Sequence, residues 1–106
     1  MEEAIHVTTT ADNQEIVKKI GRHLVEMRLA SCAQIIGPIT SIYWWKEKVE
    51  ETEEWLCVIK SRQSLYEAIE REITRLHTYE LPEIIALKIE RGLPGYMKWI
   101  MDETAK

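Results

Sequence analysis

Histidine, cysteine and carboxylate side chains are the groups in this sequence that could bind a metal ion. His77 and Glu83 flank a short segment that ends in Pro82, and Cys32 opens a run of strand-forming residues. Imidazole and thiolate groups are the ligands that copper and zinc prefer, with carboxylates as weaker partners. His77, Glu83 and Cys32, with Glu80 as a further candidate, are therefore the residues that could bind copper or another divalent cation. No cofactor is expected to be obligatory.

Each of these side chains also has an ordinary structural interpretation, which the sequence leaves open. His77 would end a helix, where a positively charged imidazole interacts favourably with the helix dipole. A free cysteine such as Cys32 is often simply a small buried hydrophobic residue. Cys57 alternates with the apolar residues Trp55 and Ile59, so we expect it in the core. The two cysteines lack the CxxC spacing of a zinc site, and we expect both to be reduced.

Cationic and aromatic residues form a second candidate set, for a ligand cleft between subunits. The set consists of Lys60, Arg62, Tyr79 and Trp44. Such groups suit a small anionic ligand. Lys60 and Arg62 also fit the solvated end of a strand, which is the simpler interpretation of these two residues.

Patterns typical of enzymes are absent from the sequence. It contains no GxSxG, HExxH, P-loop or GxGxxG motif, and no recognisable pair of nucleophile and base. We therefore predict no catalytic residue and no enzymatic activity. The aromatic run Tyr43–Trp45 could stack on nucleic-acid bases, but the net charge of −4 argues against this partner. Packing between subunits is the better interpretation of the run.

Length and composition indicate one domain that spans residues 1–106. With 45% hydrophobic and 30% charged residues, the chain is neither disordered nor a membrane protein by composition. No apolar run approaches the length of about 20 residues that a transmembrane helix needs. Because the sequence opens with acidic residues and no basic signal-peptide region, we predict a cytoplasmic location.

The hydrophobic periodicity predicts a ferredoxin-like α+β fold of order βαββαβ with a short C-terminal helix. Strands are expected at residues 4–9 and 83–89, on either side of a long central hairpin. Asp12 and Glu15 have the spacing of a capping box, and so have Ser64 and Glu67, so a helix is expected to begin at each pair. Pro94 suits the first turn of the terminal helix.

The central hairpin is predicted to be unusually long and to lie between subunits. If its first strand begins at Cys32, that strand holds about fourteen residues and spans roughly 45 Å. Gly37-Pro38 predicts a bulge or an edge position within it, and the turn is expected near Glu47 and Lys48. Large apolar side chains occur on both of its faces, and an exposed hairpin of this kind requires a partner surface. The sequence therefore predicts an oligomer.

Three sequence blocks resemble the signature of the CutA divalent-cation tolerance family. They are RLASCA at residues 28–33, TSIYWW at residues 40–45 and HTYELPEIIA at residues 77–86, with Tyr96 and Trp99 matching in the terminal helix. The resemblance implies a homotrimer of ferredoxin-like subunits whose hairpins wrap their neighbours, similar to the trimeric nitrogen-signalling regulators. It also implies a link to tolerance of divalent metals, copper in particular, and, for vertebrate relatives, to acetylcholinesterase anchoring. No firmly assigned reaction comes with the family.

One departure from the family pattern concerns the metal site. Thr8 and Leu76 stand where some members have a cysteine and the first of two adjacent histidines, so only His77 of that set is present. The trimer that the resemblance implies would still allow a weak site for copper or another divalent cation across a cleft between chains, formed by His77 with Glu83 or Cys32. The resemblance still predicts a divalent-cation tolerance or metal-responsive homotrimer, with its own copies and divalent metal ions as partners. The alternative is a trimeric signalling or scaffold protein that binds a small anionic ligand between subunits. A third possibility is a purely structural interaction module.

Overall fold

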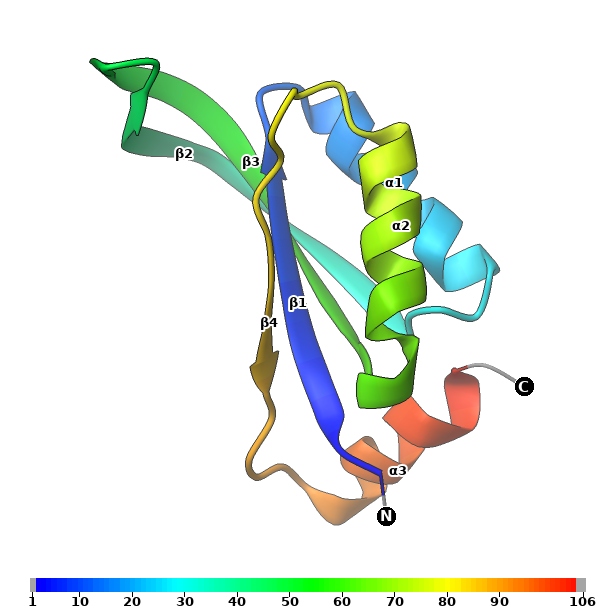
Figure 1. The fold of residues 1–106 in the computed structure, drawn as a ribbon. Helices are drawn as coiled ribbons and strands as arrows, with labels where there is room; N and C mark the ends of the chain where they lie inside the picture. Colours follow the sequence, from blue (N-terminus) through cyan, green and yellow to red (C-terminus); the bar gives the residue numbers. More distant parts are fainter. Residues whose placement is uncertain (1, 105–106) are drawn as a thin grey trace.

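The chain folds around one four-stranded antiparallel sheet with the strand order β2-β3-β1-β4 (Figure 1). The computed structural model describes residues 2–104. The elements, in order, are β1 (Ala4–Ala11), α1 (Gln14–Glu26), β2 (Cys32–Trp45), β3 (Lys48–Arg62), the 3-10 helix η1 (Gln63–Leu65), α2 (Tyr66–Leu76), β4 (Ile84–Lys88) and α3 (Pro94–Glu103). This order confirms the predicted ferredoxin-like α+β fold with its additional C-terminal helix.

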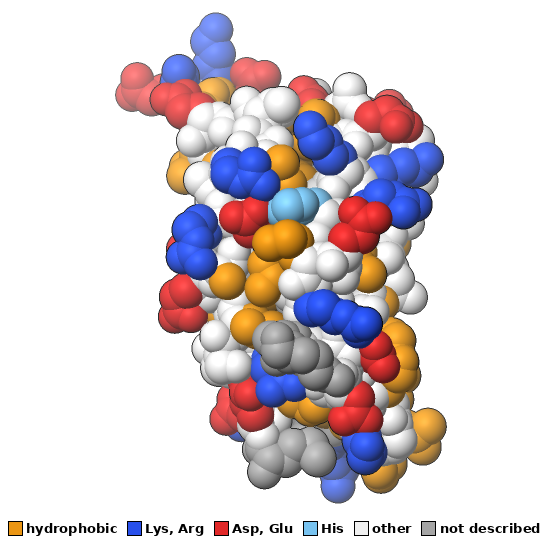
Figure 2. All heavy atoms as spheres, turned by 90° about the vertical axis from the view of Figure 1, so that its right-hand side faces the viewer, with side chains coloured by type: hydrophobic (Ala, Val, Ile, Leu, Met, Phe, Trp, Pro, Cys, Tyr) orange, Lys and Arg blue, Asp and Glu red, His pale blue; other side chains and the backbone are white. Residues whose placement is uncertain are grey.

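Helices α1 and α2 cover one face of the sheet and form the core with it (Figure 1). Apolar side chains that recur at helical spacing are buried there, such as Ile20 of α1 and Ile73 of α2, whereas Met27 at the end of α1 is 54% exposed. Cys57 of β3 is fully buried among them, as predicted, and burial raises the pKa of its thiol to about 12. Cys57 is therefore an inert core residue. The solvent side of the two helices carries charged side chains of both signs (Figure 2).

Both helices begin differently from the prediction. The N-cap of α1 is Asn13 and not Asp12, because the Asn13 side chain accepts hydrogen bonds from the backbone of Glu15 at 2.8 Å and Ile16 at 3.4 Å. Asp12 is thereby left outside the helix. Ser64 caps nothing with its side chain, since η1 precedes α2, and the backbone N–H of Ser64 donates to Glu2 instead.

The β2–β3 hairpin extends well beyond the rest of the sheet (Figure 1). Its strands hold 14 and 15 residues, which confirms the long first strand from Cys32. The turn lies at Lys46 and Glu47, one residue earlier than predicted, and both residues have a positive φ, as a tight two-residue hairpin turn requires. The register shifts between Ile36 and Ile39, so the bulge predicted at residues 37–38 is confirmed.

Apolar side chains of β4 are exposed on the second face of the sheet. On β4, which is one residue shorter at each end than the predicted strand, Ile85 pairs with Thr8 and Leu87 with His6. These side chains lie on the face opposite α1 and α2, and Ile85 and Leu87 are 52% and 60% exposed. No helix among residues 2–104 is long and apolar enough to cross a membrane.

Candidate functional site

A groove of about 810 Å³ lies between the outer half of the hairpin and the loop that joins α2 to β4. Its lining has two chemical classes in particular. The carboxylates are Asp12, Glu54, Glu80 and Glu83, and the aromatic residues are Tyr43, Trp44, Trp45 and Tyr79. No lysine or arginine lines it among the residues that the structure describes. The groove therefore has the electrostatic character of a site for cations.

Glu54 and Tyr79 form the buried polar contact of the groove. The Tyr79 hydroxyl donates to Glu54 Oε2 at 2.6 Å, and Glu54 is only 5% exposed. Burial raises the pKa of Tyr79, and the hydrogen bond to Glu54 and the nearby charges of Glu54 and Asp12 raise it further. The phenol therefore stays protonated and fixes the loop against the hairpin.

Two hydrogen bonds of His77 fix the start of the same loop. Its Nδ1 accepts from the backbone N–H of Tyr79 at 3.0 Å, and its Nε2 lies 2.7 Å from the carbonyl oxygen of Thr10. Because the first contact needs a lone pair on Nδ1, the proton must be on Nε2, where it is donated to Thr10. His77 thus fits a neutral imidazole with both nitrogens engaged, rather than a charged group at a helix end.

Glu83 and Glu80 lie at the groove with partners of their own. Glu83 Oε2 accepts from the Thr8 hydroxyl at 3.4 Å. Glu80 Oε2 is 3.5 Å from Lys46 Nζ, and that ammonium lies 5.5 Å from the centroid of the Trp45 ring. Both carboxylates are exposed, so these contacts leave them accessible to a ligand.

Cys32 is not near His77 and Glu83 within one chain. It pairs with Lys60 across the hairpin, six positions along β3 from Glu54, which corresponds to about 20 Å of strand. Its sulfur lies 3.7 Å from the Tyr96 hydroxyl of α3. Among residues 2–104, no three His, Cys, Asp or Glu side chains gather closely enough to hold a metal ion. The structure thus brings together His77 and Glu83 at one loop and places Cys32 elsewhere.

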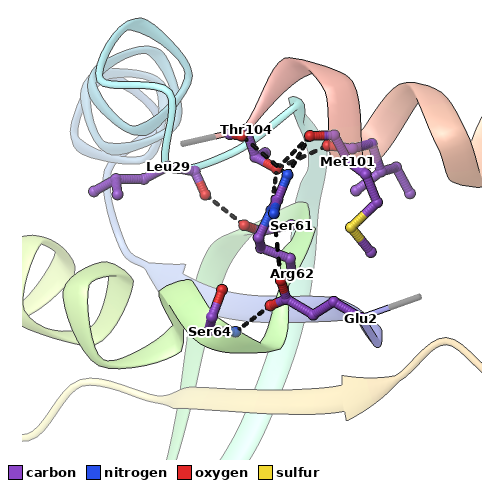
Figure 3. Close-up of polar contacts among 8 residues, drawn as sticks. Glu2, Leu29, Ser61, Arg62, Ser64, Met101 and Thr104 are labelled. Carbon is purple, nitrogen blue, oxygen red and sulfur yellow. Dashed lines mark hydrogen bonds and ion pairs between the residues drawn. The ribbon is translucent and has the colours of Figure 1, made fainter. Parts of the chain in front are cut away.

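The four residues of the predicted ligand cleft are also divided between two regions. Trp44 and Tyr79 line the groove, whereas Lys60 donates to Gln34 and Arg62 lies at the opposite end of β3. Figure 3 shows that the Arg62 guanidinium is surrounded by acceptors. It donates to Thr104 Oγ1 at 2.9 Å, to the Thr104 carbonyl at 3.1 Å, to the Met101 carbonyl, and to Glu2 Oε1 at 3.3 Å. Arg62 therefore ties the end of α3 to the sheet.

Two groove residues, Glu54 and Asp12, are absent from the sequence-based candidates. Glu54 shares its sheet face with the apolar residues Leu56 and Val58, because side chains alternate along a strand. An acidic residue in register with apolar positions is a detectable signal of a buried carboxylate. For Asp12 no such signal exists, because its spacing from Glu15 predicts a helix cap. In the structure Asn13 forms that cap.

Comparison with known proteins identifies the family. The family model for the CutA1 divalent ion tolerance protein matches residues 5–103. The chain belongs to the CutA1 family. The mouse relative named Protein CutA is 44% identical over 95 residues, which cover 90% of this chain and 54% of the relative. The Divalent-cation tolerance protein CutA of Thermus thermophilus is 36% identical over 104 residues, covering 98% of this chain and 99% of the relative.

Solved structures of the CutA1 family have the same fold. CutA1 from Oryza sativa superimposes with a TM-score of 0.95 at 35% identity, covering 99% of this chain and 96% of that one. The Thermus thermophilus protein gives 0.92 at 36% identity, with 99% and 100% covered. The chain spans little more than half the length of the first vertebrate and plant relatives, such as 53% of the human protein. The name of the Thermus thermophilus relative refers to divalent-cation tolerance, and neither this name nor that of the mouse relative refers to a reaction.

Proposed function

We propose that this CutA1-family chain acts in divalent-cation tolerance as a homotrimer that binds the cation weakly in the groove beside each hairpin. The observation that carries the proposal is the groove itself, which four carboxylates line without a lysine or arginine. The family's association with divalent cations supports it. No catalytic step is part of the proposal.

Carboxylate oxygens favour hard divalent cations such as Mn²⁺ over copper. A tight copper site does not fit one chain, because both nitrogens of His77 are engaged and Cys32 lies far along the hairpin. Copper binding by His77, Glu83 and Cys32 would therefore need Cys32 from a neighbouring subunit and the release of one His77 nitrogen from its hydrogen bond. The groove carboxylates do not converge on one point either, so the cation would keep much of its water and bind weakly.

The homotrimer is supported by the exposed apolar surface of the sheet and hairpin. Ile85 and Leu87 lie on the sheet face that α1 and α2 leave open, and Trp44 is exposed on the long edge strand β2. Such a surface and an unpaired edge require a cover. We expect the double variant Ile85→Asp, Leu87→Asp to sediment as a monomer; a stable trimer in this variant would remove the open sheet face from the interface.

The cytoplasmic location is part of the proposal. The relative from Archaeoglobus fulgidus is described as periplasmic and those from rice and Arabidopsis as chloroplastic. The compartment therefore differs within the family.

Calorimetric titration of the metal-free protein tests the cation site. We expect saturable Mn²⁺ binding with a dissociation constant of about 0.1–1 mM, as for weak carboxylate sites. Glu83→Gln should weaken this binding several-fold, while Cys32→Ser, the matched control outside the groove, should not change it. Absence of saturable binding, or equal binding by Glu83→Gln, would contradict the proposal.

Copper provides the second half of the same experiment. If neighbouring subunits complete a copper site with His77, the variant His77→Ala should lower the Cu²⁺ affinity without lowering that for Mn²⁺. Unchanged Cu²⁺ affinity removes His77 from the metal site. Binding of a small anion such as phosphate in place of any cation would support the alternative, an anion-binding signalling trimer.

A further inference from the structure

His6 of β1 lies on the face of the sheet that α1 and α2 leave open. Ile5 and Val7 on either side of it are buried against the helices, and side chains alternate along a strand, so His6 points the other way. Its partners on the adjacent strands are Lys60 of β3 and Leu87 of β4. A titratable side chain is therefore present on the surface that a second copy covers in the proposed homotrimer.

Apolar side chains surround His6 on this face. Leu87, directly opposite on β4, is 60% exposed, and Ile85 in the next row is 52% exposed. Val58, in the row next to Lys60 on β3, is 7% exposed. Neighbouring strands lie only about 5 Å apart, so a subunit that covers Leu87 also covers the half-buried imidazole of His6.

The charged groups nearest to His6 across the sheet are cations. The ammonium group of Lys60 donates to Gln34 Oε1 at 2.5 Å and so lies on the same face as the imidazole. Arg62 follows two positions along β3, and its charge is balanced by Glu2. A proton on His6 would therefore place a second positive charge beside Lys60.

The carboxylates around this part of the sheet are engaged with residues other than His6. Glu83 accepts from the Thr8 hydroxyl, two positions along β1, and Glu3 pairs with Lys88 at 3.3 Å. Helix α3, which also lies against β1, has its titratable groups paired as follows: Tyr96 with Cys32, Lys98 with Asp102, and Glu103 with Arg28. The chain thus supplies His6 with a cationic neighbour and with no carboxylate contact of its own.

Acidification would act on this surface through the imidazole. Histidine is the side chain that ordinarily gains a proton between about pH 8 and pH 5. In a separated chain water solvates the charged ring, whereas in the assembly the ring is buried beside an ammonium group, and both burial and the like charge disfavour the proton. Separated chains therefore bind the proton more readily than the assembly does. Association is then strongest above neutral pH and weakens as pH falls.

We propose that His6 makes the contact between subunits sensitive to pH, so that the assembly is stable at neutral pH and loosens in mild acid. The proposal rests on the homotrimer proposed above, in which a second copy covers the open sheet face. It requires no metal ion and no other ligand.

Subunit exchange tests this proposal on the full chain in its native oligomeric state. Isotope-labelled and unlabelled protein are mixed at about pH 7.5 and at about pH 5.5, and native mass spectrometry follows the appearance of mixed trimers. We expect exchange to be faster at the lower pH by about tenfold or more.

Three variants assign the effect to a residue. His6→Gln keeps a polar side chain without a titratable ring and should exchange at the same rate at both pH values. His6→Lys carries the positive charge throughout and should exchange fast at both. His23→Gln, on α1 and away from the open sheet face, is the matched control and should keep the pH dependence of the wild type.

The possible results separate the pH response from the homotrimer itself. Trimers that exchange at equal rates, not at all, or more slowly in acid would overturn the role of His6 and leave the homotrimer standing, as would a pH dependence that persists in His6→Gln. Exchange that is slower in acid would assign a carboxylate of the neighbouring subunit to His6. A chain that is monomeric at both pH values would overturn the homotrimer and the pH response together.

Discussion

The two ends of strand β3 use charged side chains in opposite ways. At the α3 end, Arg62 is enclosed by acceptors from Glu2, Met101 and Thr104, and Thr104 is fully buried. At the hairpin end, carboxylates line an open groove together with exposed aromatic rings. The charge of Arg62 at the α3 end is thus satisfied within the fold. Of the groove carboxylates at the hairpin end only Glu54 is buried, whereas Asp12, Glu80 and Glu83 are exposed to solvent. Charged residues near the two ends of one strand can therefore have a structural role or a binding role, depending on whether the chain itself supplies their partners.

The largest effect on stability is expected from Arg62→Ala. The substitution leaves the carbonyl groups of Met101 and Thr104 without their donor, and should lower the free energy of unfolding by about 3 kcal/mol. Chemical denaturation measures this change, with the exposed Arg71→Ala of α2 as the control, for which about 0.5 kcal/mol or less is expected. Mn²⁺ binding should be unaffected. A folded Arg62→Ala protein that has lost cation binding would contradict the assignment of a structural role to the α3 end of β3 and a binding role to its hairpin end.

A smaller effect is expected from Tyr79→Phe at the groove. Glu54 is almost fully buried and would lose the hydroxyl that donates to it, which should cost about 1–2 kcal/mol in chemical denaturation. The variant keeps the ring and all groove carboxylates, so its Mn²⁺ affinity should change little. If the stability of Tyr79→Phe equals that of the wild type, the Glu54 contact does not fix the loop.

The smallest effect is expected from Glu72, which lies on the helix-covered side, away from both ends of β3. Arg75 and His23 donate to its carboxylate and lower its pKa from 4.5 to about 2. A lowered pKa in the folded state means that this stabilisation is present above pH 4.5 and is lost as pH falls toward 2. Glu72→Gln should therefore melt a few degrees lower near neutral pH, and thermal melts should show the gap closing in acid. A gap that persists or widens in acid would assign it to another cause.

The fold could be predicted from the sequence because its signals are local. The apolar spacing from Ile16 to Leu24, the interruption at residues 37–38 and the aromatic strand residues each specify one element or one irregularity. The N-cap of α1 and the hairpin turn each lie one position from the predicted place. For the cap the reason is that neighbouring polar residues such as Asp12 and Asn13 are equally suited to it.

The site could be predicted only in part because its contacts join distant segments. Glu83 and Tyr79 are candidates from the sequence, one for the metal site and one for the ligand cleft, and both line the groove. It could not show that Tyr79 meets Glu54, 25 residues away, or that Arg62 turns to α3, 39 residues and more away. Those contacts depend on where the hairpin and the terminal helix pack, which no local pattern specifies.

The central claim is that cations bind at the hairpin end of β3 and not at its α3 end. Paramagnetic broadening by Mn²⁺ in an amide NMR spectrum of the assembled protein tests it most directly, because the broadening falls steeply with distance from the ion. We predict selective loss of the amide signals of residues 77–83 and of the outer hairpin, while those of Ser61 and Thr104 persist. Broadening centred on α3, or spread evenly over the chain, would contradict the account.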